Sequence, residues 1–405
     1  MALASCSSEG AHTALSPALV PFVLQKGGGA QWVQFGPNTP GFNFGPIVTG
    51  VDHNLWFLEE NSDSLVRISM SGAVKVFPIG VSGVAMAVGS DGKFYVLSES
   101  THVTQVTTKG ALKTFTIPSS DTTQLGSDGI GPDGNVWFVE GSHIAKITPV
   151  GVITEFAYPD SSSVNCCGGV TTGSDGNVWF AHSGLNYIGK VNPTTGHITP
   201  FAVQAGCAPA AVVEAKDGNV WFACLQLSGM IGRVKPNGTV NMFTGGGAFN
   251  SNETEQFGAR GPDGEPWFAS GSSDVVFRVN TATQTITSFN PPLVSGERPD
   301  ALSAGPDGNV WVDTVGGHVD VLVFNPMTVT PKSLTFTSTG LTKNVTVAEN
   351  GVSAWTATSS NTAIATVAQG GMANVFKVTS VGVGTCKVTI ADGAGNSVAV
   401  KVTVQ

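Results

Sequence analysis

Side chains able to do chemistry follow seven regularly spaced aromatic residues in this 405-residue chain. His182 and Glu140 each stand three residues after a Trp, at the ends of Val-Trp-Phe-Ala-His and Val-Trp-Phe-Val-Glu. A histidine near a carboxylate can act as a general base or bind a divalent cation such as Mg²⁺ or Ca²⁺. His182 and Glu140 are therefore candidate catalytic residues and candidate metal ligands. The alternative is that both are solvated polar residues at a rim, with no cofactor bound.

Polar residues also stand 11 to 14 positions before the same aromatic residues. Asp300 is the third catalytic candidate and could bind a polar ligand together with Arg298; a local ion pair is the alternative. If the segments on either side of the intervening turn are antiparallel strands, both sets of residues meet at one end of the sheets. The candidate ligand-binding residues at this end are Arg298, Glu255, Gln124 and Glu59.

Four of the six cysteines are expected near the same end: Cys166, Cys167, Cys207 and Cys224. In an exported protein, disulfides are the default for such cysteines. A bridge from Cys166 or Cys167 to Cys207, with Cys224 taking the remaining partner, covers two of the three possible pairings. A metal–thiolate site is the alternative, although the usual spacing of zinc ligands is missing. Cys386 stands alone and is expected to pack as a small buried hydrophobe.

The aromatic residues belong to an internal repeat, whose clearest copy is Gly-Pro-Asp-Gly-Asn-Val-Trp-Phe at 131–138. The Asp-Gly pair is typical of a tight turn, and each unit has the pattern of four short strands. Four strands in about 40 residues, repeated around an axis, are typical of a propeller blade. The aromatic residues are Trp56, Tyr95, Trp137, Trp179, Trp221, Trp267 and Trp311. The sequence therefore predicts an all-β fold with a seven-bladed β-propeller over residues 31–325.

The seventh unit lacks a fourth strand, and a matching pattern, Trp32–Phe35, precedes the first unit. Placed at the outer edge of the last blade, this N-terminal strand would close the ring and cover an exposed strand edge.

Residues 326–405 lack the repeat and alternate between apolar and polar residues, which predicts a small β-sandwich. Trp355 is a candidate core residue of this domain. The stretch that begins at Trp355, together with Gly382-Val-Gly-Thr-Cys-Lys-Val-Thr-Ile, resembles the bacterial immunoglobulin-like group 2 domains. The resemblance implies an extracellular spacer or adhesion module.

Composition excludes some classes of partner. The formal net charge is −9 and only 12% of the residues are charged, so no basic face is available for nucleic acid. No stretch approaches the roughly 20 apolar residues of a membrane span. Leu3-Ala4-Ser5-Cys6 resembles a bacterial lipobox, which would lipidate Cys6, although a chance match is the alternative. Residues 1–30 are then a lipobox remnant and linker. The protein is expected to be exported, and to be anchored in the outer membrane, displayed on the cell surface or extracellular.

The repeat, with the Ile-Gly-Arg-Val and Ile-Thr-Glu-Phe segments after it, resembles the streptogramin B lyase (virginiamycin B lyase) propellers over about residues 31–325. The resemblance implies a magnesium-dependent elimination that opens a cyclic depsipeptide, with a catalytic His 11 residues before an aromatic repeat residue. We call these seven positions the His slots. They hold Gly45, Val84, Gly126, Gly168, Ala210, Gln256 and Asp300.

Since no His slot holds His, the sequence favours a surface-displayed binding or structural protein without catalytic activity. Its expected partner is a protein, a glycan or a cell-envelope component. The alternative is a divalent-metal-dependent carbon–oxygen lyase or hydrolase. It would act on a cyclic ester or lactone at the mouth of the propeller's central channel, where the two sets of polar residues are expected to meet.

Overall fold

The computed structural model describes most of the chain between Phe22 and Gln405. The described ranges are 22–27, 30–35, 44–59, 62–69, 73–98, 101–118, 125–159, 168–227, 229–244, 257–293, 296–315, 318–323, 328–348, 355–392 and 397–405. Within these ranges the chain is built from β-strands, with a single 3-10 turn at Gly271–Ser273. No helix in this part of the chain is long and apolar enough to span a membrane.

The described residues between 22 and 323 form seven antiparallel sheets, numbered here by the order of their aromatic repeat residues. Sheets one to three are β3 (Phe44–Thr49), β4 (Leu55–Glu59), β5 (Ser64–Ile68), β6 (Val74–Pro78); β7 (Gly83–Val88), β8 (Phe94–Ser98), β9 (His102–Val106), β10 (Leu112–Thr116); and β11 (Leu125–Ile130), β12 (Val136–Glu140), β13 (His143–Ile147), β14 (Ile153–Ala157). Sheets four to six are β15 (Val170–Thr172), β16 (Val178–His182), β17 (Tyr187–Val191), β18 (Ile198–Ala202); β19 (Pro209–Glu214), β20 (Val220–Cys224), β21 (Met230–Val234), β22 (Val240–Thr244); and β23 (Gly258–Arg260), β24 (Pro266–Ser270), β25 (Val275–Asn280), β26 (Thr285–Phe289). Sheet seven is β27 (Arg298–Ala304), β28 (Val310–Val315), β29 (Val319–Val323), β2 (Ala30–Phe35) and β1 (Phe22–Gly27).

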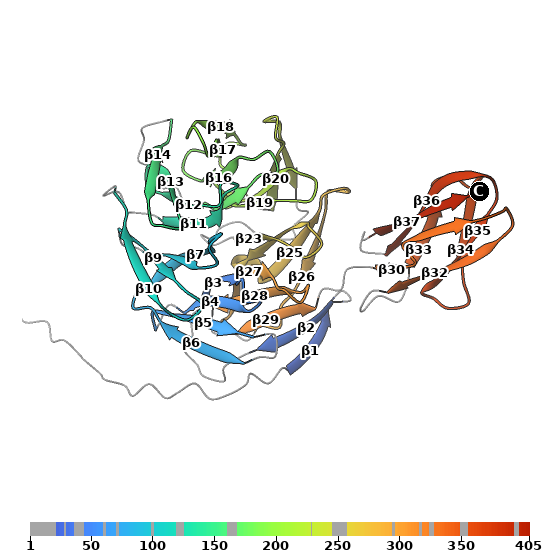
Figure 1. Cartoon of the computed structure of the whole chain (residues 1–405), viewed down its shortest axis with the longest axis horizontal. Helices are drawn as coiled ribbons and strands as arrows, with labels where there is room; N and C mark the ends of the chain where they lie inside the picture. The colour runs from blue at the N-terminus through green and yellow to red at the C-terminus, as the bar shows by residue number, and fades with distance from the viewer. Residues whose placement is uncertain are drawn as a thin grey trace, which may run out of the picture.

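The first strand of each sheet contacts the first strand of the next, and β27 of sheet seven contacts β3 of sheet one. The seven sheets therefore surround a common centre as a β-propeller (Figure 1). Apolar side chains fill the space between neighbouring sheets. For example, Leu97 of sheet two packs in one core cluster with Val136 and Phe138 of sheet three.

The N-terminal strand β2 pairs with β29 at the outer side of sheet seven. In β2, Trp32 pairs with Leu322 and Phe35 pairs with Val319 of β29. Trp32 is 1% exposed and joins the core cluster between sheets six and seven. The further strand β1 pairs with β2 and lies within residues 1–30, where the sequence predicted only a linker. It makes sheet seven five-stranded.

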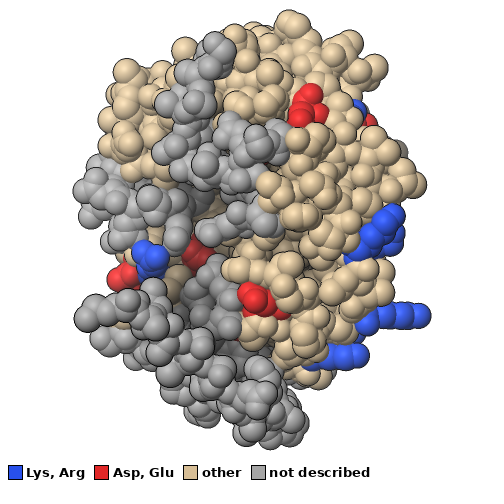
Figure 2. All heavy atoms as spheres, turned by 90° about the vertical axis from the view of Figure 1, so that its left-hand side faces the viewer, with Lys and Arg blue, Asp and Glu red and all other residues tan. Residues whose placement is uncertain are grey.

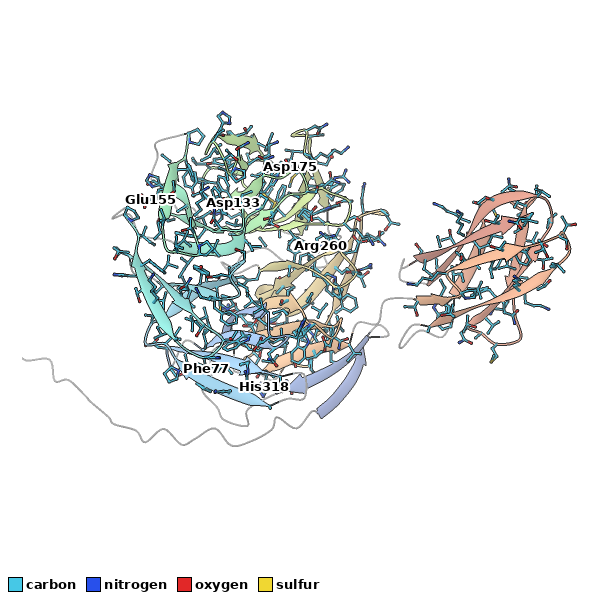
Figure 3. The ribbon with its side chains drawn as sticks, in the orientation of Figure 1. Phe77, Asp133, Glu155, Asp175, Arg260 and His318 are labelled. Atoms are coloured by element: carbon cyan, nitrogen blue, oxygen red, sulfur yellow. A yellow bond between two sulfur atoms is a disulfide. The ribbon has the colours of Figure 1, made fainter. Side chains whose placement is uncertain are left out.

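The repeated turn is held by its own side chains. In sheet three, the indole N–H of Trp137 donates to Asp133 Oδ1 at 2.9 Å, and Lys146 Nζ lies 3.1 Å from Asp133 Oδ2. Burial alone would raise the pKa of Asp133, but hydrogen bonds from Trp137, Asn135 and Lys146 outweigh it and hold the pKa below its ordinary value. A Cβ at Gly131 would lie 2.4 Å from the indole, so only glycine fits there. Figure 3 labels Asp133 and its counterpart Asp175 in the neighbouring sheet.

Residues 328–404 form two further sheets, drawn in Figure 1 as a separate body. The first has the order β30 (Thr328–Thr330), β32 (Thr342–Ala348), β35 (Val375–Ser380) and β34 (Ala365–Gln369); the second has the order β31 (Ser333–Phe336), β37 (Ser397–Val404), β36 (Gly384–Asp392) and β33 (Trp355–Ser359). Both sheets contribute to one core, which includes Phe336, Phe376 and Val388. Cys386 is buried in this core at 5% exposure, as predicted, and Trp355 packs against it while partly buried.

Candidate functional site

The strand register brings the two sets of polar positions together. Residues three after the aromatic repeat residue pair with residues at the start of the first strand: Phe44 with Glu59, Gly83 with Ser98, Leu125 with Glu140, Pro209 with Cys224 and Pro299 with Thr314. Each of these strand pairs also contains a bulge directly after the first-strand residue. The register therefore places both sets of positions at one end of these five sheets. We call this end the channel mouth.

His182 and Glu140 belong to the walls at this mouth. His182 is fully buried and Glu140 is 1% exposed, so neither is the solvated rim residue that one interpretation of the sequence predicted. The His182 ring lies 4.8 Å from the Tyr158 ring and 4.7 Å from the Tyr187 ring, measured between centroids. Its Nδ1 accepts a hydrogen bond from the Leu185 N–H at 3.3 Å. As an acceptor, Nδ1 carries no proton, so the neutral imidazole bears its proton on Nε2.

Of the other candidate site residues, Glu59, Arg298 and Asp300 lie within the described ranges. Glu59 is 2% exposed, and its Oε2 accepts a hydrogen bond from the Ser62 N–H at 2.8 Å. Arg298 opens β27 and is partly exposed, whereas Asp300 lies in the β27 bulge at 8% exposure. Gln124 and Glu255 lie outside the described residues, as does Cys6.

Sequence reasoning missed a group of buried acidic residues in sheet seven. Asp313 and Asp320 are fully buried, and Glu297 is 7% exposed. Asp313 Oδ1 accepts a hydrogen bond from the Ala301 N–H at 2.6 Å, while Glu297 pairs with His318, which is labelled in Figure 3. The available signal was an Asp within each of two otherwise apolar strands, Val-Trp-Val-Asp and Val-Asp-Val-Leu.

Burial, and to a smaller extent the nearby negative charge of Glu297, raise the pKa of Asp320 to about 7, with the Gln34 side chain opposing both. Gln34 belongs to the closing strand β2 and stands opposite Asp320 in the register. This carboxyl group therefore lies at the junction between the N-terminal strand and the last sheet.

The cysteines pair differently from the bridge that the sequence favoured. Cys207 and Cys224 form a disulfide within sheet five, with both residues fully buried. The predicted bridge from Cys166 or Cys167 to Cys207 is therefore wrong. The register explains the pairing, because Cys224 stands opposite Pro209, two residues after Cys207. Cys166 and Cys167 lie outside the described residues.

Removing this disulfide should destabilise the propeller. The bridge closes a loop of 17 residues, so a Cys207→Ala/Cys224→Ala variant should lose about 3 kcal/mol of unfolding free energy. Urea unfolding with and without reductant measures the loss, and reductant should shift the wild type but not the variant. Identical midpoints for the oxidised wild type and the double variant would contradict the assignment.

The resemblance to the lyases implies a magnesium ion, which takes oxygen ligands such as carboxylates. Among the residues that the structure describes, no three His, Cys, Asp or Glu side chains come together as metal ligands would. His182 Nδ1 is already occupied by the Leu185 N–H. The described residues therefore do not fit a divalent-cation site, and we derive no chemical step through one.

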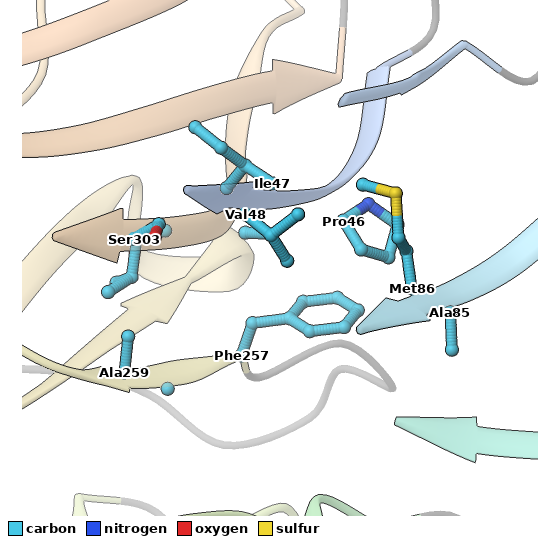
Figure 4. Close-up of a pocket in the computed structure, with 11 residues that line it drawn as sticks. Pro46, Ile47, Val48, Ala85, Met86, Phe257, Ala259 and Ser303 are labelled. Carbon is cyan, nitrogen blue, oxygen red and sulfur yellow. The ribbon is translucent and has the colours of Figure 1, made fainter. Parts of the chain in front are cut away.

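A cavity of about 210 Å³ lies between the first strands of sheets one, two, six and seven (Figure 4). Its lining residues are Pro46, Ile47, Val48, Ala85, Met86, Phe257, Gly258, Ala259, Ala301, Leu302 and Ser303. None of them is charged, and only Ser303 has a polar side chain. Among the described residues on the face shown in Figure 2, charged side chains are few.

Comparison with known proteins agrees with this architecture. Virginiamycin B lyase from Staphylococcus aureus is similar in structure, with a TM-score of 0.64 and 21% identity over 72% of this chain and 99% of that chain. A streptogramin B lyase structure gives a TM-score of 0.63 and 22% identity over 73% of this chain and 97% of the other. The extracellular domain of a proposed one component system from B. thetaiotaomicron gives a TM-score of 0.54 and 11% identity, over 95% of this chain and 62% of the other.

Among curated proteins, no sequence matches this chain. The model of the Virginiamycin B lyase family, in contrast, matches residues 27–166 and 163–319, which is most of the propeller. The chain belongs to the Virginiamycin B lyase family.

Proposed function

We propose that this chain is an exported binding protein without lyase activity, built on a seven-bladed propeller whose blades are the seven sheets. The observation that carries the proposal is the content of the His slots. The described slot residues are Gly45, Val84, Gly126, Gly168, Ala210 and Asp300, and the seventh slot residue in the sequence is Gln256. Without an imidazole in a slot, the general base that the resemblance to the lyases implies is missing.

The nearest substitutes support the same proposal. His182 is enclosed by Tyr158 and Tyr187, and its Nδ1 accepts a backbone hydrogen bond. A general base must come within hydrogen-bond reach of the proton that it removes. A fully buried ring held in this way stabilises the wall of the propeller, and Glu140 is buried in the neighbouring sheet.

The rest of the chain fits display outside the cell. Residues 326–405, as an immunoglobulin-like domain, would act as a spacer, and Cys6 would carry a lipid anchor. The fold is similar to that of an extracellular domain from B. thetaiotaomicron, and this similarity supports export. The partner class that suits this arrangement is a protein, a glycan or another component of the cell envelope.

A ring-opening assay tests the absence of lyase activity. The full chain is incubated with a streptogramin B depsipeptide and Mg²⁺, and the product is followed by liquid chromatography, because an elimination opens the ring without changing its mass. A family lyase serves as the positive control. We expect no opened product above the buffer rate. Magnesium-dependent ring opening by the wild type, lost in Asp300→Asn, would overturn the proposal.

A further inference from the structure

The apolar cavity adjoins the channel mouth. In three of its four walls the first lining residue directly follows a described His slot: Pro46 follows Gly45, Ala85 follows Val84, and Ala301 follows Asp300. In the fourth wall, Phe257 follows position 256 of the sequence. Along these strands the cavity therefore begins one residue after the His slot.

The walls of the cavity are fixed by the sheets behind them. Ile47 is 5% exposed, Met86 is 3% exposed and Leu302 is 5% exposed, and each belongs to a core cluster between two sheets. Figure 4 shows the Phe257 ring lying between Val48 and Ala85, with Met86 and Pro46 nearby. An apolar cavity with rigid walls is a binding site that needs little rearrangement.

The lining decides which chemistry the cavity accepts. No lining side chain carries a charge, so an ion that left water for this cavity would find no oppositely charged partner. The Ser303 hydroxyl lies 3.4 Å from the backbone carbonyl oxygen of Ala304, to which it donates. An apolar group gains from contact with the lining side chains, which are apolar except for Ser303.

We propose that this cavity receives an uncharged apolar group of the ligand, an aromatic ring or a branched hydrocarbon, inserted from the channel mouth. The inference rests on the proposed binding function and names the chemistry of that site. A ligand group that enters here would be recognised by shape and apolar contact with Phe257 and Met86. Its polar part would remain at the mouth.

Titration of the full chain with toluene tests the inference, with benzylammonium and benzoate as charged analogues of the same ring. The readout is the Met86 methyl resonance in protein labelled at its methionine methyl groups, assigned by comparison with Met86→Leu. Toluene should shift this resonance in a saturable manner, and both charged analogues should bind at least about tenfold more weakly.

Two variants that fill the cavity, Ala259→Leu and Ser303→Leu, should each weaken toluene binding about tenfold or more. Thr171→Leu is the matched control, because Thr171 of β15 stands eight residues before its Trp, as Ala259 and Ser303 do, but does not line the cavity. The control should keep wild-type affinity. Two variants are used so that the test survives if one fails to fold.

Three results would overturn the inference: no saturable toluene binding, equal binding of a charged analogue, or unchanged affinity in both filled variants. None of these results depends on ring opening. The ring-opening assay can therefore contradict the proposed function while the cavity binds toluene, and the cavity can fail while the chain still lacks lyase activity.

Discussion

Replacing Glu265 by Ala is expected to lower the unfolding free energy by about 2 kcal/mol, because it leaves the buried Thr281 N–H without its acceptor and removes the ion pair with Lys216. Glu265 is 1% exposed, and its Oε2 accepts a hydrogen bond from the Thr281 N–H at 3.0 Å. Its Oε1 lies 2.9 Å from Lys216 Nζ and 3.9 Å from Arg278 Nη2. Lys216 belongs to the turn of sheet five, so the network joins two sheets.

The cost comes mainly from the buried partners. Lys216 is 47% exposed, and its ion pair contributes little because water screens it. The Arg278 side chain is 7% exposed and keeps its ion pair with Asp263, so the cost falls mainly on the Thr281 N–H, which loses its buried acceptor. The repeat has Asn at this position in five other sheets, whereas here it reads Gly-Glu-Pro-Trp, and the Glu joins two sheets.

Urea unfolding of Glu265→Ala against the wild type measures the loss. Glu214→Ala is the matched control, because Glu214 also pairs with an arginine of sheet six, at 2.7 Å, but that Arg260 is 51% exposed. The control should lose about 1 kcal/mol or less. Equal losses in both variants would show that burial does not determine the strength of these pairs.

The propeller was predictable from sequence because its signals are local. The Asp, Gly and Trp of each turn lie within seven residues of one another and bond to one another, as Asp133 and Trp137 do. The closing strand was predictable for the same reason, since Trp32–Phe35 carries the pattern that the last unit lacks. Strand β1 carries no such pattern and is defined by its pairing with β2.

The chemistry of the mouth was less predictable, because it depends on contacts between distant residues. The alternation of β16 places His182 at a strand end but does not reveal that Tyr158, 24 residues earlier, covers its ring. The disulfide partner of Cys224 likewise depends on strand register. The four cysteines expected near the mouth leave three pairings open when only the sequence is known.

Asp320 should make the propeller less stable as the pH rises from about 4 to 7. Its folded pKa of about 7 lies above the ordinary value of 3.8, so in this range the folded chain holds a proton that the unfolded chain releases. The contribution of Asp320 to stability is therefore fully present below about pH 4, falls by about 4 kcal/mol up to pH 7, and changes no further above that. The physical cause is burial first and the Glu297 charge second, with the Gln34 side chain acting against them. Asp320→Asn should abolish this decline, as measured by urea unfolding at intervals of pH.

Asp133→Asn is a control with the opposite pH dependence. The pKa of Asp133 is lowered in the folded chain, so its contribution to stability disappears below about pH 4 instead. A decline between pH 4 and 7 that persists unchanged in Asp320→Asn would assign it to another group. Loss of the decline would show that ionising one carboxyl group at the closing strand sets the pH dependence of the whole ring, since β2 holds the last sheet to the N-terminus through the same register.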